Sequence, residues 1–212
     1  MMHRLDAGAP RRARPPRAAV FLDKDGTLVE DVPFNVDPAQ LRFAPRAFEA
    51  LRRLAARGFA LVIVSNQPGL ACGRFDAGQW AGMRVAIEAA FAQAGVPLAA
   101  VCWCPHAPDG AGRPLCSCRK PEPGMLLAAA HALGLALPRS WMVGDILDDV
   151  EAGCRAGCRT VLLDVGHETV WARGPQRVPD ARVPGLWEAA HHIIEHAGAA
   201  ASPARRRSRA SA

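Results

Sequence analysis

Two aspartates separated by one residue follow an apolar stretch near the start of the chain, in Phe21-Leu-Asp-Lys-Asp-Gly-Thr-Leu28. One of the two carboxylates, Asp23 or Asp25, could attack phosphorus and form an aspartyl-phosphate. The other could protonate a leaving oxygen and then activate water. Gly26 permits a sharp backbone turn directly after the pair. The same short pattern also fits a turn whose acids are solvated, so the choice depends on the rest of the chain.

A cluster of cysteine and histidine residues lies in the middle of the chain. Cys104-Pro-His106 is followed, after nine intervening residues, by Cys116-Ser-Cys118. Thiolates and imidazole are zinc ligands, and four of them close a tetrahedral structural site. The surrounding loop is otherwise too long and polar to be ordered unaided. We therefore expect Cys104, His106, Cys116 and Cys118 to hold a structural Zn²⁺; unrelated free thiols are the alternative.

Apolar runs alternate along the chain with amphipathic segments. The apolar runs predict strands, and the amphipathic segments predict helices with Gly or Asp at their ends. This alternation indicates an α/β domain with a mainly parallel sheet, without an internal repeat or a second domain. The predicted strands are 18–22, 59–64, 99–103, 141–144 and 160–164, and the predicted helices are 45–57, 76–94, 123–133, 148–156 and 186–196.

Polar residues end three of the predicted strands: Asp23, Ser65 and Asp145. In parallel sheets of this kind the binding site lies beyond the carboxyl ends of the strands. We therefore expect these three side chains to share one site. The histidines outside the cysteine cluster, His167 among them, have no acid at a convincing spacing, so we expect them in packing or surface positions.

The positive charge of the chain belongs to its ends. The 212 residues carry a formal charge of +6. Residues 1–17 and 205–209 together contribute +8, which leaves residues 18–204 at −2. We expect disordered basic tails at 1–17 and 198–212 around a domain at 18–197, because Arg, Ala, Pro and Ser cannot build a core. A polyanion tether is the functional alternative for the tails.

Several protein classes are disfavoured by the composition. No run approaches 18 consecutive apolar residues, and no apolar signal-peptide core precedes the first motif, so we expect no membrane partner. Seven clustered cysteines fit metal ligands or free thiols in a reducing compartment, so we expect a cytoplasmic protein. Because the body of the domain is slightly acidic, we expect no nucleic-acid partner, and a domain of this size can work as a monomer.

Four motifs in the same order resemble those of the haloacid-dehalogenase-like (HAD-like) phosphohydrolases, across about residues 18–170. They are the Asp23-Lys-Asp25 segment, Val62-Ile-Val-Ser-Asn-Gln67, Arg119-Lys120-Pro121 and Met142-Val-Gly-Asp-Ile-Leu-Asp-Asp149. The resemblance implies a doubly wound, mainly parallel sheet. It also implies a phosphatase that works through an aspartyl-phosphate.

By position, the resemblance implies that Asp23 is the nucleophile and Asp25 the general acid and base. Ser65 would hold a phosphoryl oxygen, and Lys120 would neutralise phosphate charge. Mg²⁺ would bind Asp23, the backbone carbonyl of Asp25, and Asp145. Asp149 matches a second acid of the fourth motif, further from the metal. Hard oxygen ligands suit Mg²⁺, and cationic groups offset the repulsion between phosphate and an attacking carboxylate.

The Cys/His loop is similar to that of one subgroup, the heptose-bisphosphate and histidinol-phosphate phosphatases, in which it replaces a cap domain. This similarity implies a phosphorylated-sugar substrate, D-glycero-D-manno-heptose 1,7-bisphosphate, with loss of its 7-phosphate. Pro68, Ile146 and Phe34 depart from the usual residues of that group. The substrate contacts that the resemblance implies are Asp31, Phe34, Ser65, Asn66, Arg119 and Lys120.

Three other functions fit parts of the sequence. Histidinol-phosphate phosphatase is the main alternative within the same subgroup. A polynucleotide 3′-phosphatase would account for the basic tails, but the acidic domain body and the lack of a nucleic-acid module disfavour it. An inactive, zinc-stabilised binding module is disfavoured because the acids and Lys120 that chemistry requires are all present.

Overall fold

The computed structural model describes residues 16–197. Two short 3-10 helices, Pro38–Gln40 and Leu137–Arg139, supplement the main elements. The strands are β1 (Ala19–Leu22), β2 (Ala60–Asn66), β3 (Leu98–Cys104), β4 (Trp141–Gly144), β5 (Arg159–Leu163) and β6 (Ala181–Val183). The helices are α1 (Ala47–Ala56), α2 (Ala77–Gln93), α3 (Gly124–Leu133), α4 (Leu147–Ala156) and α5 (Leu186–Glu195).

All six strands described in residues 16–197 form one parallel sheet in the order β3-β2-β1-β4-β5-β6. The strand order reverses at β1, which pairs with β2 on one side and β4 on the other. The predicted α/β class and parallel sheet are therefore confirmed. A switch point of this kind places the ends of β1, β2 and β4 around a common crevice.

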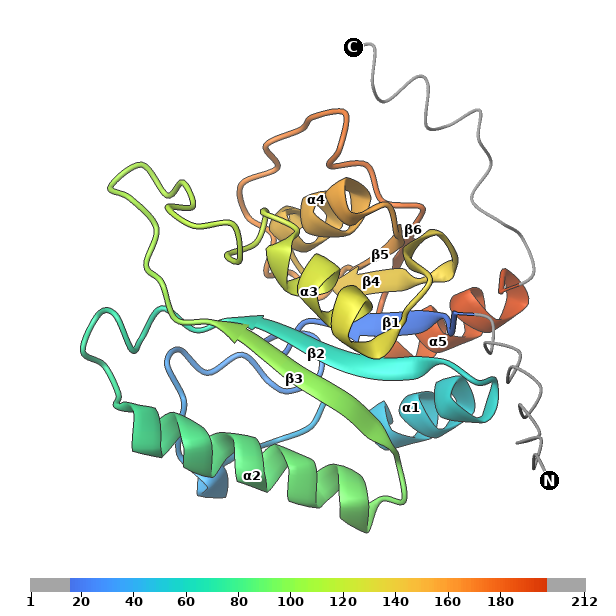
Figure 1. The fold of residues 1–212 in the computed structure, drawn as a ribbon, viewed down its shortest axis with the longest axis horizontal. Helices are drawn as coiled ribbons and strands as arrows, with labels where there is room; N and C mark the ends of the chain where they lie inside the picture. The colour runs from blue at the N-terminus through green and yellow to red at the C-terminus, as the bar shows by residue number, and fades with distance from the viewer. Residues whose placement is uncertain (1–15, 198–212) are drawn as a thin grey trace, which may run out of the picture.

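Helices cover both faces of the sheet, as Figure 1 shows. One core joins α1, α2 and α5 to residues such as Val20 and Leu22 of β1. A second core joins α3 and α4 to Ala19 and Phe21, which point to the opposite face. The alternation follows from the two-residue period of a strand. Because both faces are covered, β1 is apolar and buried along its whole length.

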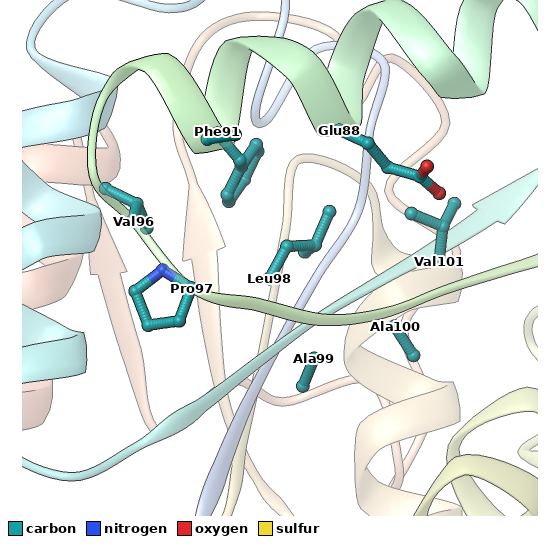
Figure 2. Close-up of a pocket in the computed structure, with 9 residues that line it drawn as sticks. Glu88, Phe91, Val96, Pro97, Leu98, Ala99, Ala100 and Val101 are labelled. Atoms are coloured by element: carbon teal, nitrogen blue, oxygen red, sulfur yellow. The ribbon is translucent and has the colours of Figure 1, made fainter.

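β3 is an edge strand, and a cavity of about 380 Å³ lies between it and the end of α2. Figure 2 shows Phe91, Leu98 and Val101 around this space. The lining is mostly apolar, with Glu88 as its only acid. No residue expected to do chemistry lines this cavity, so it does not mark the active site.

The amino ends of the strands surround a second cavity. Pro16 and Ala197, which begin and end the described chain, both line it. Arg17 Nε and Nη2 donate to the carbonyls of Gly58 and Phe59 at 2.6 and 2.8 Å. Arg17 therefore packs on the domain, although the sequence places it in the first basic tail. Pro16 is described as well, and the remaining residues of the two predicted tails, 1–15 and 198–212, lie outside the described residues.

Most predicted elements differ from the observed ones by only one or two residues. β6 is the exception, because three half-exposed residues leave no apolar run to recognise. The third strand also continues to Cys104, so this cysteine lies in the sheet and not in the following loop. Within residues 16–197, no helix is both long and apolar enough to cross a membrane.

Candidate active site

The end of β1 carries the two aspartates of the first motif. The backbone N–H of Asp23 donates to the carbonyl of Val143 in β4 at 2.9 Å, which continues the sheet by one residue. Gly26 then turns the chain with φ = 77°, and its N–H donates to Val29 O. Asp23 is 8% exposed, and Lys24 is buried and pairs with Asp25. The turn therefore places both carboxylates beyond the carboxyl edge of the sheet.

The end of β2 contributes Ser65, Asn66 and the following Gln67. The side-chain amide of Gln67 donates at 2.9 Å to Ser65 Oγ and at 2.9 Å to Asp25 Oδ2. Because Ser65 Oγ accepts this bond, its own O–H can donate to a phosphoryl oxygen. Gln67 thus holds two of the predicted catalytic groups in one arrangement.

Lys120 reaches the same site from the loop before α3. It is buried, and its ammonium pairs with Asp23 Oδ1 and lies 2.6 Å from Asp149 Oδ1. Nζ also donates to Val64 O at 3.0 Å. Asn66 holds the Lys120 backbone from both sides, accepting from its N–H at 3.0 Å and donating to its carbonyl at 3.1 Å. Both polar ends of the Asn66 side chain are therefore engaged in hydrogen bonds to the Lys120 backbone.

The fourth motif places Asp145 directly after β4, and Asp149 in the first turn of α4. Asp145 Oδ1 accepts a hydrogen bond from Thr27 Oγ1 at 3.2 Å. Its other oxygen, Oδ2, lies 2.7 Å from Nδ1 of His167. The expectation that His167 has no acidic partner is therefore wrong, because the chain after β5 returns to the carboxyl edge of the sheet.

Negative charge dominates this site. Burial raises the pKa of Asp25, with a further contribution from Asp23. Burial and the charge of Asp23 also raise the pKa of Asp145, to about 6. Burial opposes the charge of Lys120, but Asp149 and Asp23 outweigh it and raise the pKa of this lysine. Lys120 therefore remains an ammonium, and the surrounding carboxylates still exceed the cations.

The excess of buried carboxylates fits a divalent cation. One carboxylate oxygen from each of Asp23, Asp145 and Asp149 lies within 4.8 Å of the others. Lys120 pairs with one oxygen of Asp23 and one of Asp149, and it makes no such pair with Asp145. A Cβ on Gly26 would lie 2.1 Å from Asp145 Oδ2, so only glycine leaves room for this carboxylate. Hard oxygen donors in this number suit Mg²⁺, which retains several waters.

The four predicted zinc ligands come together at the end of β3, which holds Cys104, and in the loop that follows it. Sγ of Cys104 lies 3.5 Å from Sγ of Cys116 and 3.1 Å from Sγ of Cys118, and His106 Nδ1 lies 3.3 Å from Cys118. Although burial opposes it, bonds from Cys118 and the Arg119 N–H lower the pKa of Cys116 to about 7. Sulfur and nitrogen donors in this cluster fit a closed tetrahedral zinc site.

Three of the predicted substrate contacts, Asp31, Phe34 and Arg119, lie in the loops after β1 and β3. Arg119 follows the cysteine cluster, and its Nη1 donates to His106 O at 3.3 Å. Phe34 is 45% exposed, adopts φ = 56°, and lies under the Arg74 guanidinium at 5.6 Å. Asp31 is exposed in the same loop. The loops after β1, β2 and β3 thus extend beyond the same end of the sheet (Figure 1).

Two residues that contact the predicted site residues, Gln67 and His167, are not among the residues predicted from the sequence. Gln67 is adjacent to the second motif, so its position two residues after Ser65 is a usable signal. His167 is 22 residues from Asp145 in the sequence, and no local sequence pattern predicts that the two side chains are in contact. Its only sequence signal is its place after the last long apolar strand, whose carboxyl end faces the site.

Comparisons with known proteins all indicate the same protein family. A family model described as HAD-hydrolase-like matches residues 117–189. D-glycero-beta-D-manno-heptose-1,7-bisphosphate 7-phosphatase of Escherichia coli K12 is 38% identical over 172 residues, covering 80% of this chain and 86% of the relative. Its namesake from Pasteurella multocida is 40% identical over 153 residues, covering 71% and 83%.

A solved structure agrees with the sequence comparison. The D,D-heptose 1,7-bisphosphate phosphatase of B. bronchiseptica, complexed with magnesium and phosphate, is 31% identical and aligns with a TM-score of 0.73. The alignment covers 85% of this chain and 99% of that structure. The similarity therefore extends over most of this chain and nearly all of that structure.

Proposed function

Because the chain belongs to the HAD-like hydrolases and is a phosphatase, we propose that it removes the 7-phosphate of D-glycero-D-manno-heptose 1,7-bisphosphate. The pairing of Lys120, from the loop before α3, with Asp23 at the end of β1 is the observation that carries the chemistry. The relatives named above support the choice of sugar. Mg²⁺ and a structural Zn²⁺ are part of this proposal, as is a monomer that requires neither nucleic acid nor membrane.

The first step transfers the phosphoryl group to the protein. Asp23 attacks phosphorus in line with the sugar oxygen, and Asp25 donates its proton to that oxygen as the P–O bond breaks. A raised pKa suits Asp25 to this role, because more of the carboxyl group carries a proton at neutral pH. Ser65 and Lys120 donate hydrogen bonds to the phosphoryl oxygens and stabilise their growing charge.

The second step releases phosphate. Asp25, now a carboxylate, takes a proton from water, which attacks the aspartyl-phosphate and regenerates Asp23. Gln67 holds Asp25 throughout by the bond to Oδ2. Mg²⁺, held by Asp23, the Asp25 carbonyl and Asp145, would supply charge that offsets the repulsion between the phosphate and the carboxylates. We propose that Arg119, Phe34 and Asp31, from the loops after β3 and β1, contact the sugar and its second phosphate.

A substrate panel tests the proposal. Purified protein with Mg²⁺ is given both anomers of the heptose bisphosphate, histidinol phosphate and a 3′-phosphorylated oligonucleotide, and phosphate release is measured. We expect kcat/KM for one heptose anomer to exceed that for the other esters by at least about tenfold. A preference for histidinol phosphate would overturn the substrate assignment. A zinc-containing protein that hydrolyses none of the esters would instead be a binding module.

A further inference from the structure

His167 lies in the segment between β5 and β6, and the proposed chemistry makes no use of it. Its Nδ1 is 2.7 Å from Oδ2 of Asp145. The Asp145 side chain is 6% exposed, whereas that of His167 is 37% exposed. A half-exposed imidazole therefore covers one oxygen of a buried carboxylate that faces the proposed cation.

The contact leaves the Asp145 carboxylate little freedom. Thr27 Oγ1 donates to Oδ1 from one side, and His167 lies on Oδ2 from the other. The backbone of Gly26 packs against both groups: a Cβ there would lie 2.1 Å from Asp145 Oδ2 and 2.5 Å from His167 Nδ1. The carboxylate is therefore held by three residues, which come from two segments of the chain.

The segment that carries His167 is attached firmly to α4. Glu168 accepts a hydrogen bond from the backbone N–H of Leu147 at 2.7 Å. Arg177 pairs with Asp148 and Glu151 of the same helix, each at 2.6 Å. These contacts all involve the first turns of α4, and they keep the imidazole beside Asp145.

We propose that His167 is a positioning residue, which donates its Nδ1–H to Asp145 and orients that carboxylate toward the divalent cation. The inference rests on the proposed function. A ligating carboxylate that is already oriented binds its cation with less reorganisation, and removal of such an outer partner typically weakens metal binding by about 10–100-fold. His167 acts through Asp145 and touches neither the substrate nor the phosphoryl group.

Two substitutions at this position test the role. His167→Ala removes the donor, whereas His167→Asn places an amide N–H close to the position of Nδ1. Calorimetric titration of Mg²⁺ into the full-length protein with inorganic phosphate measures the cation affinity without turnover. We expect about tenfold or weaker binding in the alanine variant, and recovery to within about threefold of wild type in the asparagine variant.

Kinetics and a control separate orientation from other roles. At saturating Mg²⁺, kcat and the KM for the sugar of His167→Ala should both return to near the wild-type values. His131→Ala, on an exposed part of α3, should leave Mg²⁺ binding unchanged. Thermal unfolding verifies that each variant is folded before the titration.

Three results would overturn the inference. Unchanged or tighter Mg²⁺ binding by His167→Ala would mean that the imidazole contacts Asp145 only when no cation is bound and does not orient it for the cation. Failure of His167→Asn to recover affinity would exclude the donated hydrogen bond. A raised sugar KM with normal Mg²⁺ affinity would make His167 a substrate contact. Because the calorimetry needs no hydrolysis, failure of the substrate panel would not by itself decide this question.

Discussion

At the scale of single residues, polar side chains next to the catalytic ones hold the site together. Gln67 joins Ser65 to Asp25, and Asn66 holds the backbone of Lys120. Gln67 uses both protons of its amide group, and Asn66 uses one amide proton and the carbonyl oxygen. Few hydrogen bonds of these two side chains are therefore left for a ligand. The amide groups after β2 therefore contribute to the order of the site before any substrate binds.

Asp23→Asn should abolish turnover and leave the fold intact. Asparagine cannot form the acyl phosphate, so kcat should fall by about 10³-fold or more, as for other removed nucleophiles. Lys120 keeps Asp149 as a partner, which avoids an isolated buried charge. Phosphate release and circular dichroism measure the two effects. Glu49→Gln, on exposed α1, is the matched control, and full activity of Asp23→Asn would refute the nucleophile assignment.

Asn66→Ala should lower kcat with little effect on the KM for the sugar. Without the clamp, the Lys120 ammonium loses its placement beside Asp23, and a shift of about 1 Å can cost about 100-fold in rate. Stability should fall by about 2 kcal/mol, because a backbone donor and acceptor lose their partner. Steady-state kinetics and urea unfolding measure both changes. A raised KM with normal kcat would instead support the substrate contact inferred from the sequence.

The sequence predicts residues that share a local motif better than residues joined by the fold. Asp23 and Asp25 lie two residues apart after an apolar run, so their common site follows from the strand alone. The contact of His167 with Asp145 requires the paths of β4, β5 and the following segment, which no spacing rule contains. The roles of the individual site residues remain predictions.

At the scale of elements, α4 links two loops that meet at the site. Arg155 lies 2.5 Å from Glu122, two residues after Lys120, and 2.5 Å from Glu151. Glu151 also accepts from Arg177 in the segment that carries His167. One helix thus connects the loop that carries Lys120 to the segment that carries His167. Cys116 and Cys118 lie in the first of these loops, shortly before Lys120.

Cys116→Ser should release zinc and destabilise the domain. A hydroxyl is a poor zinc ligand, and metal binding supplies part of the folding free energy. We expect less than one zinc per chain by metal analysis, and a loss of about 4 kcal/mol or more in the free energy of unfolding. Cys72→Ser, at an exposed cysteine outside the cluster, should change neither quantity. Retention of one zinc per chain would remove Cys116 from the ligand set.

Long periodic elements are predictable from the chain, and short edge elements are not. For α2, Asp76 accepts from Gln79 N at 2.8 Å, so the predicted cap is the observed one. Strand β6 consists of three residues at the sheet edge, and its pairing with β5 specifies it more than its composition does. The same reasoning explains why the third strand extends one residue further than its apolar run.

At the scale of the whole molecule, we predict that the basic ends of the chain can be removed without loss of activity. Removal of residues 1–15 and 198–212 should leave kcat/KM within about twofold and the melting temperature within a few degrees, because their Arg-, Ala-, Pro- and Ser-rich composition cannot build a core. Further truncation to residue 18 should lower stability, since Arg17 satisfies the carbonyls of Gly58 and Phe59. Differential scanning calorimetry distinguishes the two. Loss of activity on removal of residues 1–15 and 198–212 alone would show that these residues have a role in turnover.

The cavity lined by both Pro16 and Ala197 has a practical consequence. The two ends of the domain meet beside the amino ends of the strands, whereas the acids and Lys120 lie at the carboxyl ends. Neighbouring termini are the usual condition for circular permutation and for insertion of one domain into another. The protein could therefore be grafted into a loop of a carrier, or fixed to a solid support through either end, with its catalytic face turned toward the solution.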